Sequence, residues 1–109
     1  MATTYKVLGQ SAPSATTATT LYTVPSATEA VVSTITICNR ANTSGTYRIS
    51  IRPDGASIAN QHYIAYDVAI AANDTTALTL GITMDAADVL EVYASSADMS
   101  FNAFGSEIS

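Results

Sequence analysis

The chain has 109 residues, a formal net charge of −5 and 12% charged residues, about half of the ~25% that is usual in soluble domains. One histidine, one cysteine and four basic residues argue against a multi-ligand zinc site, an internal disulfide and a stripe that follows nucleic-acid phosphates. With so few basic residues, we expect no nucleic acid as partner. No stretch reaches the ~18 apolar residues of a membrane span, so we expect no membrane as partner either. The length favours a single domain covering residues 1–109.

The first twenty residues stand apart because residues 9–20 are rich in Ser, Thr and Ala. We expect residues 1–20 to form either an extended N-terminal arm or an edge strand. Residues 1–6 lack the charged region and the apolar run of a signal peptide, which predicts synthesis in a cytoplasm.

Apolar residues further along recur with a period of two, which is typical of β-strands, and no eleven-residue window shows a helical stripe. Turn residues separate the apolar runs every 10 to 15 residues. This spacing predicts an all-β chain of about eight short strands, folded as an antiparallel β-sandwich of jelly-roll or immunoglobulin-like type. The clearest strands are expected at 31–38, 47–52, 62–70, 78–84, 89–94 and 99–104.

The alternation also assigns faces, and it places Tyr47 and Tyr66 toward the core. Tyr63 and Tyr93 fall on the opposite face, where they can anchor a partner, stack on a sugar or pack within the fold. Arg48 and Arg52 share the outer face of one strand, where they either pair with acids of a neighbouring subunit or stay solvated. Tyr63, Tyr93, Arg48 and Arg52 are therefore the candidate partner contacts.

The residues that catalysis would need are scarce. His62 is the only candidate general base, and Asp67 is five residues away, which places the two on opposite faces of one strand. Most aspartates stand in turn segments, where the side chain normally caps the backbone. We expect no catalytic, metal-binding or cofactor-binding residue, no cofactor, and a protein that is not an enzyme.

The predicted strands also lack the lysines that commonly protect exposed sheet edges, since the chain holds a single lysine. Two explanations stay open. Either partner subunits cover part of this surface, or the edges are closed or very short.

Five segments of the chain resemble small virion proteins of tailed bacteriophages, especially those of cyanophages and marine phages. They are 6–10 (KVLGQ), 21–25 (LYTVP), 32–40 (VSTITICNR), 47–53 (YRISIRP) and 101–105 (FNAFG). The resemblance implies a virion structural protein assembled in the host cytoplasm, with the major capsid protein or tail proteins as partners. We expect a homo-oligomeric capsid decoration (cement) protein that bridges neighbouring capsomers. The alternatives are a tail, baseplate or fibre component and a carbohydrate-binding adhesin module that uses Tyr63 or Tyr93.

Overall fold

The computed structural model describes residues 2–109 and is built from strands, with two single-turn 3₁₀ helices as its only helical elements in that range. The predicted all-β class and the absence of a long helix are confirmed. The elements are β1 (Thr3–Ser11), β2 (Thr19–Thr23), β3 (Glu29–Asn39), β4 (Gly45–Arg52), η1 (Pro53–Gly55), η2 (Asn60–His62), β5 (Tyr63–Ile70), β6 (Thr75–Met84), β7 (Val89–Ala94) and β8 (Met99–Ile108).

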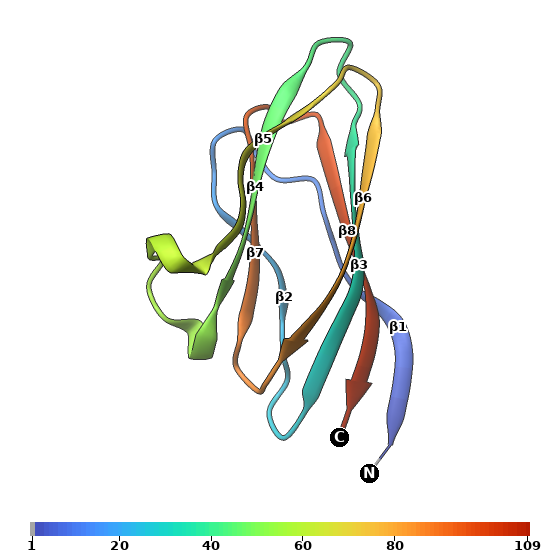
Figure 1. The fold of residues 1–109 in the computed structure, drawn as a ribbon, viewed down its shortest axis with the longest axis vertical. Coiled ribbons are helices and arrows are strands. Elements are labelled where there is room, and N and C mark those ends of the chain that lie inside the picture. Colours follow the sequence, from blue (N-terminus) through green and yellow to red (C-terminus); the bar gives the residue numbers. More distant parts are fainter. Residues whose placement is uncertain (1) are drawn as a thin grey trace.

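The strands form two antiparallel four-stranded sheets that pack face to face (Figure 1). Sheet A has the order β1-β8-β3-β6, and sheet B has the order β2-β7-β4-β5. The first strand pairs with the last, the second with the second-last, and so on inward to β4 and β5. This nested pairing is the strand order of a jelly roll, so it decides between the two predicted kinds of sandwich.

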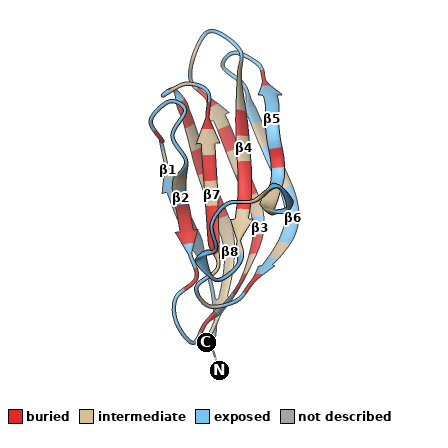
Figure 2. Ribbon diagram, turned by 90° about the vertical axis from the view of Figure 1, so that its left-hand side faces the viewer, coloured by how far each residue is buried: buried red, intermediate tan, exposed pale blue. Residues whose placement is uncertain are grey.

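The core lies between the sheets, and most of the buried residues belong to the inner strands β3, β4, β7 and β8 (Figure 2). Tyr47 of β4 faces this core as predicted, and its ring meets that of Phe101 edge-on, with centroids 6.4 Å apart. Edge-to-face contact between aromatic rings adds to the stabilisation from burial alone. The other large side chains that are almost fully buried include Ile35, Ile37, Ile49, Leu90, Val92 and Met99.

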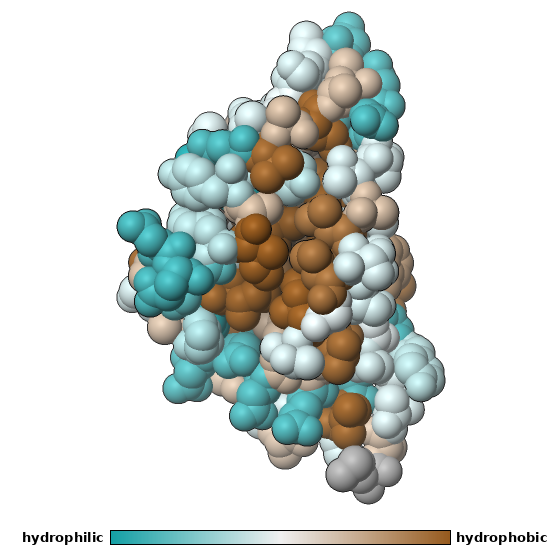
Figure 3. Space-filling view, viewed as in Figure 1, coloured by the Kyte–Doolittle hydropathy of each residue, from teal (hydrophilic) through white to brown (hydrophobic). Residues whose placement is uncertain are grey.

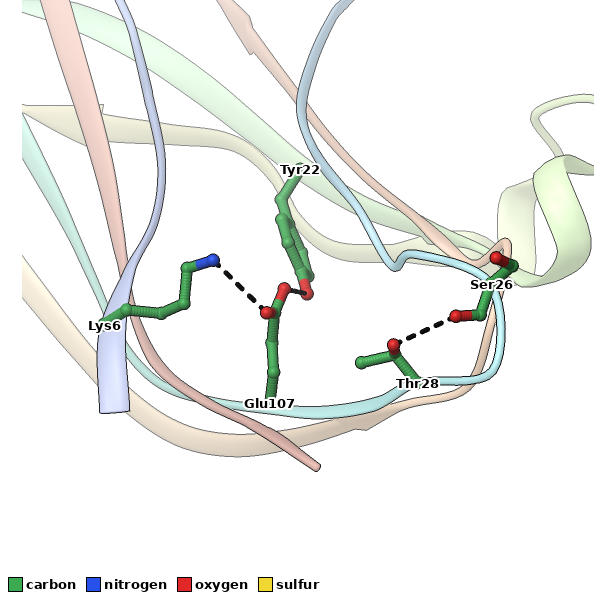
Figure 4. Close-up of polar contacts among 5 residues, drawn as sticks. All are labelled: Lys6, Tyr22, Ser26, Thr28 and Glu107. Carbon is green, nitrogen blue, oxygen red and sulfur yellow. Dashed lines mark hydrogen bonds and ion pairs between the residues drawn. The ribbon is translucent and has the colours of Figure 1, made fainter. Parts of the chain in front are cut away.

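Polar contacts tie the two sheets together at the end where the chain termini meet (Figure 4). The hydroxyl of Tyr22 in sheet B donates to Oε2 of Glu107 in sheet A at 2.5 Å. Lys6 Nζ donates to the other carboxylate oxygen at 3.2 Å. The hydrogen bond from Tyr22, followed by that from Lys6, lowers the pKa of Glu107, because both favour the charged form. Burial and the adjacent carboxylate raise the pKa of Tyr22.

All four edge strands are involved in register irregularities, which act as β-bulges. A bulge twists an edge out of line and so hinders the addition of another strand. The bulges therefore give each edge some protection of its own, and Lys6, the single lysine, lies on the edge strand β1. The irregularities lie at Val7/Gly9 in β1 and Thr20/Tyr22 in β2, in β5 opposite Tyr47/Ile49 and Ile49/Ser50, and in β6 opposite Val32/Thr34.

The bulges in β5 overturn one prediction from the alternation. Tyr66, expected in the core, is 56% exposed. Ala65 pairs with Ile49 and Val68 pairs with Tyr47, so Tyr66 and Asp67 together span the single position opposite Arg48. Asp67 adopts a φ of 51°, in the left-handed region where a bulge residue can sit. The simple alternation cannot hold across such an insertion.

Residues 3–11 form β1, an edge strand of sheet A, which pairs with β8 from Phe101 to Ile108. The following loop, residues 12–18, crosses to sheet B. The backbone N–H of Thr16 donates to the carbonyl of Ala94 at 2.8 Å and so fixes this loop beside β7. That position matters for the site described next.

Candidate functional site

Three of the four predicted partner contacts come together on the outer face of sheet B. Strand register places Tyr93 of β7 directly opposite Arg48 of β4. Tyr63 of β5 lies opposite Ser50, two residues further along β4 and therefore on the same face. Both tyrosines are half-buried on this face.

Arg48 is the centre of this group. Its guanidinium carbon lies 4.2 Å from the centroid of the Tyr66 ring and 4.3 Å from that of the Tyr93 ring. Its Nε and one terminal nitrogen donate to the two carboxylate oxygens of Asp67, at 2.6 Å and 3.3 Å. Such a forked contact suits the planar guanidinium. It raises the pKa of Arg48 and lowers that of Asp67. Together with Tyr63, these residues form the Arg48 cluster.

Tyr63 extends the cluster toward the end of β5. Its ring meets the Tyr66 ring edge-on, with centroids 4.8 Å apart and an interplanar angle of 87°. The alternation assigned Tyr66 to the core and gave Asp67 the same face as Tyr63, without linking either residue to Arg48; the bulge places both opposite Arg48. The one signal in the sequence was a charged residue, Asp67, inside an otherwise apolar run.

Arg52, the fourth candidate, has partners within its own chain. Its Nε lies 3.3 Å from Oε2 of Glu91, and its NH1 donates to the carbonyls of Gly55 and Ala56. These contacts hold the η1 turn against β4 and β7. Arg52 therefore lies on the same face as the Arg48 cluster but is not part of it.

A hollow of about 240 Å³ opens beside the Arg48 cluster, between the 12–18 loop and β5. We call it the sheet B hollow. Its aromatic walls come from Tyr63 and Tyr93, and Ser50 and Glu91 supply polar atoms. It is lined by Thr16, Ala18, Arg48, Ser50, Tyr63, Glu91, Val92 and Tyr93.

A second feature, the apolar seam, lies along the side of the sandwich between β5 and β6, where brown apolar side chains gather in Figure 3. Val68 pairs with buried Tyr47 and so faces inward, yet it stays exposed. Leu80 is 46% exposed and precedes Gly81, whose φ is +63°. The seam comprises the exposed Ile64, Val68 and Leu80 and the partly buried Leu78 and Ile82.

The other ionisable candidates serve the backbone. His62 Nδ1 accepts the backbone N–H of Ala59 at 3.1 Å. The carboxylate of Asp88 accepts the N–H groups of Asp54 and Asp85, as expected for aspartates in turns. Within residues 2–109, no three His, Cys, Asp or Glu side chains are grouped as a metal site, and no helix could cross a membrane.

Neither a protein-family model nor a curated protein matches the chain. The two candidate sites, the sheet B hollow and the apolar seam, therefore rest on their own geometry.

Proposed function

We propose that the chain is a non-enzymatic structural protein of a bacteriophage virion, a decoration protein that binds the major capsid protein as a homo-oligomer and bridges neighbouring capsomers. The apolar seam is the observation that carries this proposal. The resemblance of five sequence segments to small phage virion proteins supports the virion setting.

The seam has the character of a surface that another protein covers. Ile64, Val68 and Leu80 are each more than a third exposed. Burying such a group against a partner is favourable by about 25 cal/mol for each Å² of apolar surface removed from water. A continuous apolar patch on the surface commonly marks a protein–protein contact.

Many copies of the same contact would together stabilise a capsid shell. One copy that touches two capsomers adds a modest free energy to their association. The second contact is intramolecular once the first has formed, so bridging is stronger than either contact alone. A jelly roll is also found among viral capsid domains, although fold alone does not define function.

The first test is the protein composition of purified virions, normalised to the major capsid protein. A decoration protein that occupies every capsid subunit is expected at about one copy for each of them. A ratio of a few per cent would instead place the chain in the tail, baseplate or a fibre. Absence from the particles would overturn both virion proposals.

The second test addresses the seam. Leu80→Glu places a charge in the seam, whereas Val7→Glu places one on β1, at nearly the same exposure (46% and 47%). We expect Leu80→Glu to abolish addition of the purified protein to capsids that lack it, while Val7→Glu binds normally. Equal binding by both variants would show that the seam is not the contact. Circular dichroism checks that both variants are folded.

A further inference from the structure

We propose that the sheet B hollow binds one ring of a neutral saccharide. This inference is independent of the virion role, because the hollow lies on the outer face of sheet B and the apolar seam lies between β5 and β6. It rests on three properties of the hollow: aromatic walls, balanced charge and an open hydrogen-bond acceptor.

The aromatic walls suit the apolar faces of a sugar ring. Tyr63 and Tyr93 line the hollow from β5 and β7, and the 12–18 loop lines it through Thr16 and Ala18. The hydrogen bond from Thr16 to Ala94 fixes the loop, so this wall exists before a ligand arrives. A tyrosine offers both a flat apolar surface and a hydroxyl that can hydrogen-bond to a sugar.

The charges around the hollow pair off. Arg48 is matched by Asp67, and Arg52 by Glu91. A cationic ligand would seek the space between the Tyr66 and Tyr93 rings, but the Arg48 guanidinium already occupies it. An anion would meet the carboxylate of Glu91. The site therefore favours a ligand without net charge.

Glu91 supplies an acceptor for such a ligand. Its carboxylate lies near Arg52, yet no side chain or backbone group of residues 2–109 donates a hydrogen bond to it. An ionised carboxylate accepts several hydrogen bonds, and sugar hydroxyls can donate them. The volume, about 240 Å³, is below the roughly 300–1,000 Å³ of sites for drug-sized ligands, so it suits a single ring.

The test is an NMR titration of the ¹⁵N-labelled protein with glucose, galactose, mannose and N-acetylglucosamine, each alone. We expect at least one sugar to shift the amide signals of Tyr63, Glu91 and Tyr93. Tyr63→Ala should weaken binding about tenfold, because an aromatic contact and its buried area are lost. Glu91→Gln, which keeps size and one acceptor oxygen, should weaken it less. Tyr5→Ala removes a tyrosine that is 84% exposed on β1 and should bind as the unchanged protein does.

Three results would overturn the proposal. In the first, none of the four sugars shifts signals around the hollow. In the second, a sugar binds, but Tyr63→Ala and Glu91→Gln bind it as well as the unchanged protein. In the third, choline or inorganic phosphate shifts these signals and the sugars do not, which would define a site for a charged ligand.

Discussion

Gly105 of β8 lies directly against Val31 of β3, so closely that a Cβ at Gly105 would overlap the Val31 carbonyl oxygen. These strands form the centre of sheet A. We predict that Gly105→Ala lowers the free energy of unfolding by about 3 kcal/mol or more, because the strands must separate to admit the methyl group. Urea denaturation measures the change.

Gly81→Ala is the matched control. Gly81 has a φ of +63°, but a Cβ there meets nothing within 4 Å. Its cost should be about 1–2 kcal/mol, from backbone strain alone. Equal losses in the two variants would show that close approach at Gly105 is not the cause.

Two phenylalanines three residues apart on β8 should respond very differently to truncation. Phe101 is fully buried against Tyr47, whereas Phe104 is only half-buried. Phe101→Ala should cost about 3–5 kcal/mol through lost burial and a cavity. Phe104→Ala should cost less than about 1.5 kcal/mol. Thermal and urea unfolding of both variants test the assigned faces, and a reversed order would contradict them.

The contact between Tyr22 and Glu107 should make stability depend on acid pH. The folded pKa of Glu107 is lowered from its ordinary 4.5, so the unfolded chain takes up this proton first as the pH falls. The stabilisation is complete above pH 4.5 and is lost as the pH falls through the folded pKa. Glu107→Gln should flatten this part of the profile of unfolding free energy against pH. An unchanged acid slope would exclude Glu107 as its source.

Tyr22 should produce the opposite dependence at alkaline pH. Its pKa is raised in the fold, so above the ordinary value of 10.0 the unfolded chain loses this proton more readily. Stability should therefore fall as the pH rises past 10.0, and Tyr22→Phe should lessen the fall. An equal fall in Tyr22→Phe and in the unchanged protein would exclude Tyr22 as its source.

The Arg48 cluster has a spectroscopic signature. The Nε–H of Arg48 donates to Asp67, whose pKa lies below its ordinary 3.8. The NMR signal of this Nε–H should therefore change position only as the pH falls below 3.8 and Asp67 takes up a proton. Arg48→Lys should shift the ring signals of Tyr66 and Tyr93, because an ammonium cannot stack in the same plane. The Tyr47 ring, buried in the core, should be unaffected.

Regular strands could be predicted from the sequence because one face of each is buried. Tyr47 and Ile49 on β4 are core residues, and the outward Arg48 between them follows from the same alternation. Turn segments were also predictable, since Asp88 and its neighbours cap backbone groups as short acidic side chains do.

The edge strands were not predictable to the same degree. A bulge inserts one residue, and nothing in simple periodicity marks where it falls. Tyr66 was consequently assigned to the core, and Asp67 was never linked to Arg48 as a partner. Both are members of the Arg48 cluster, so the group that surrounds Arg48 became visible only with the register of β5.

The position of β8 has a consequence for how the protein is made. Sheet A needs β8 between β1 and β3, and the backbones of Ala2 and Ser109 exchange hydrogen bonds of 2.7 Å and 3.0 Å at its end. Until residues 99–108 are available, β1 has no partner strand in sheet A and β3 lacks its partner β8. Sheet A can therefore close only after this segment has left the ribosome, so its assembly has to follow translation.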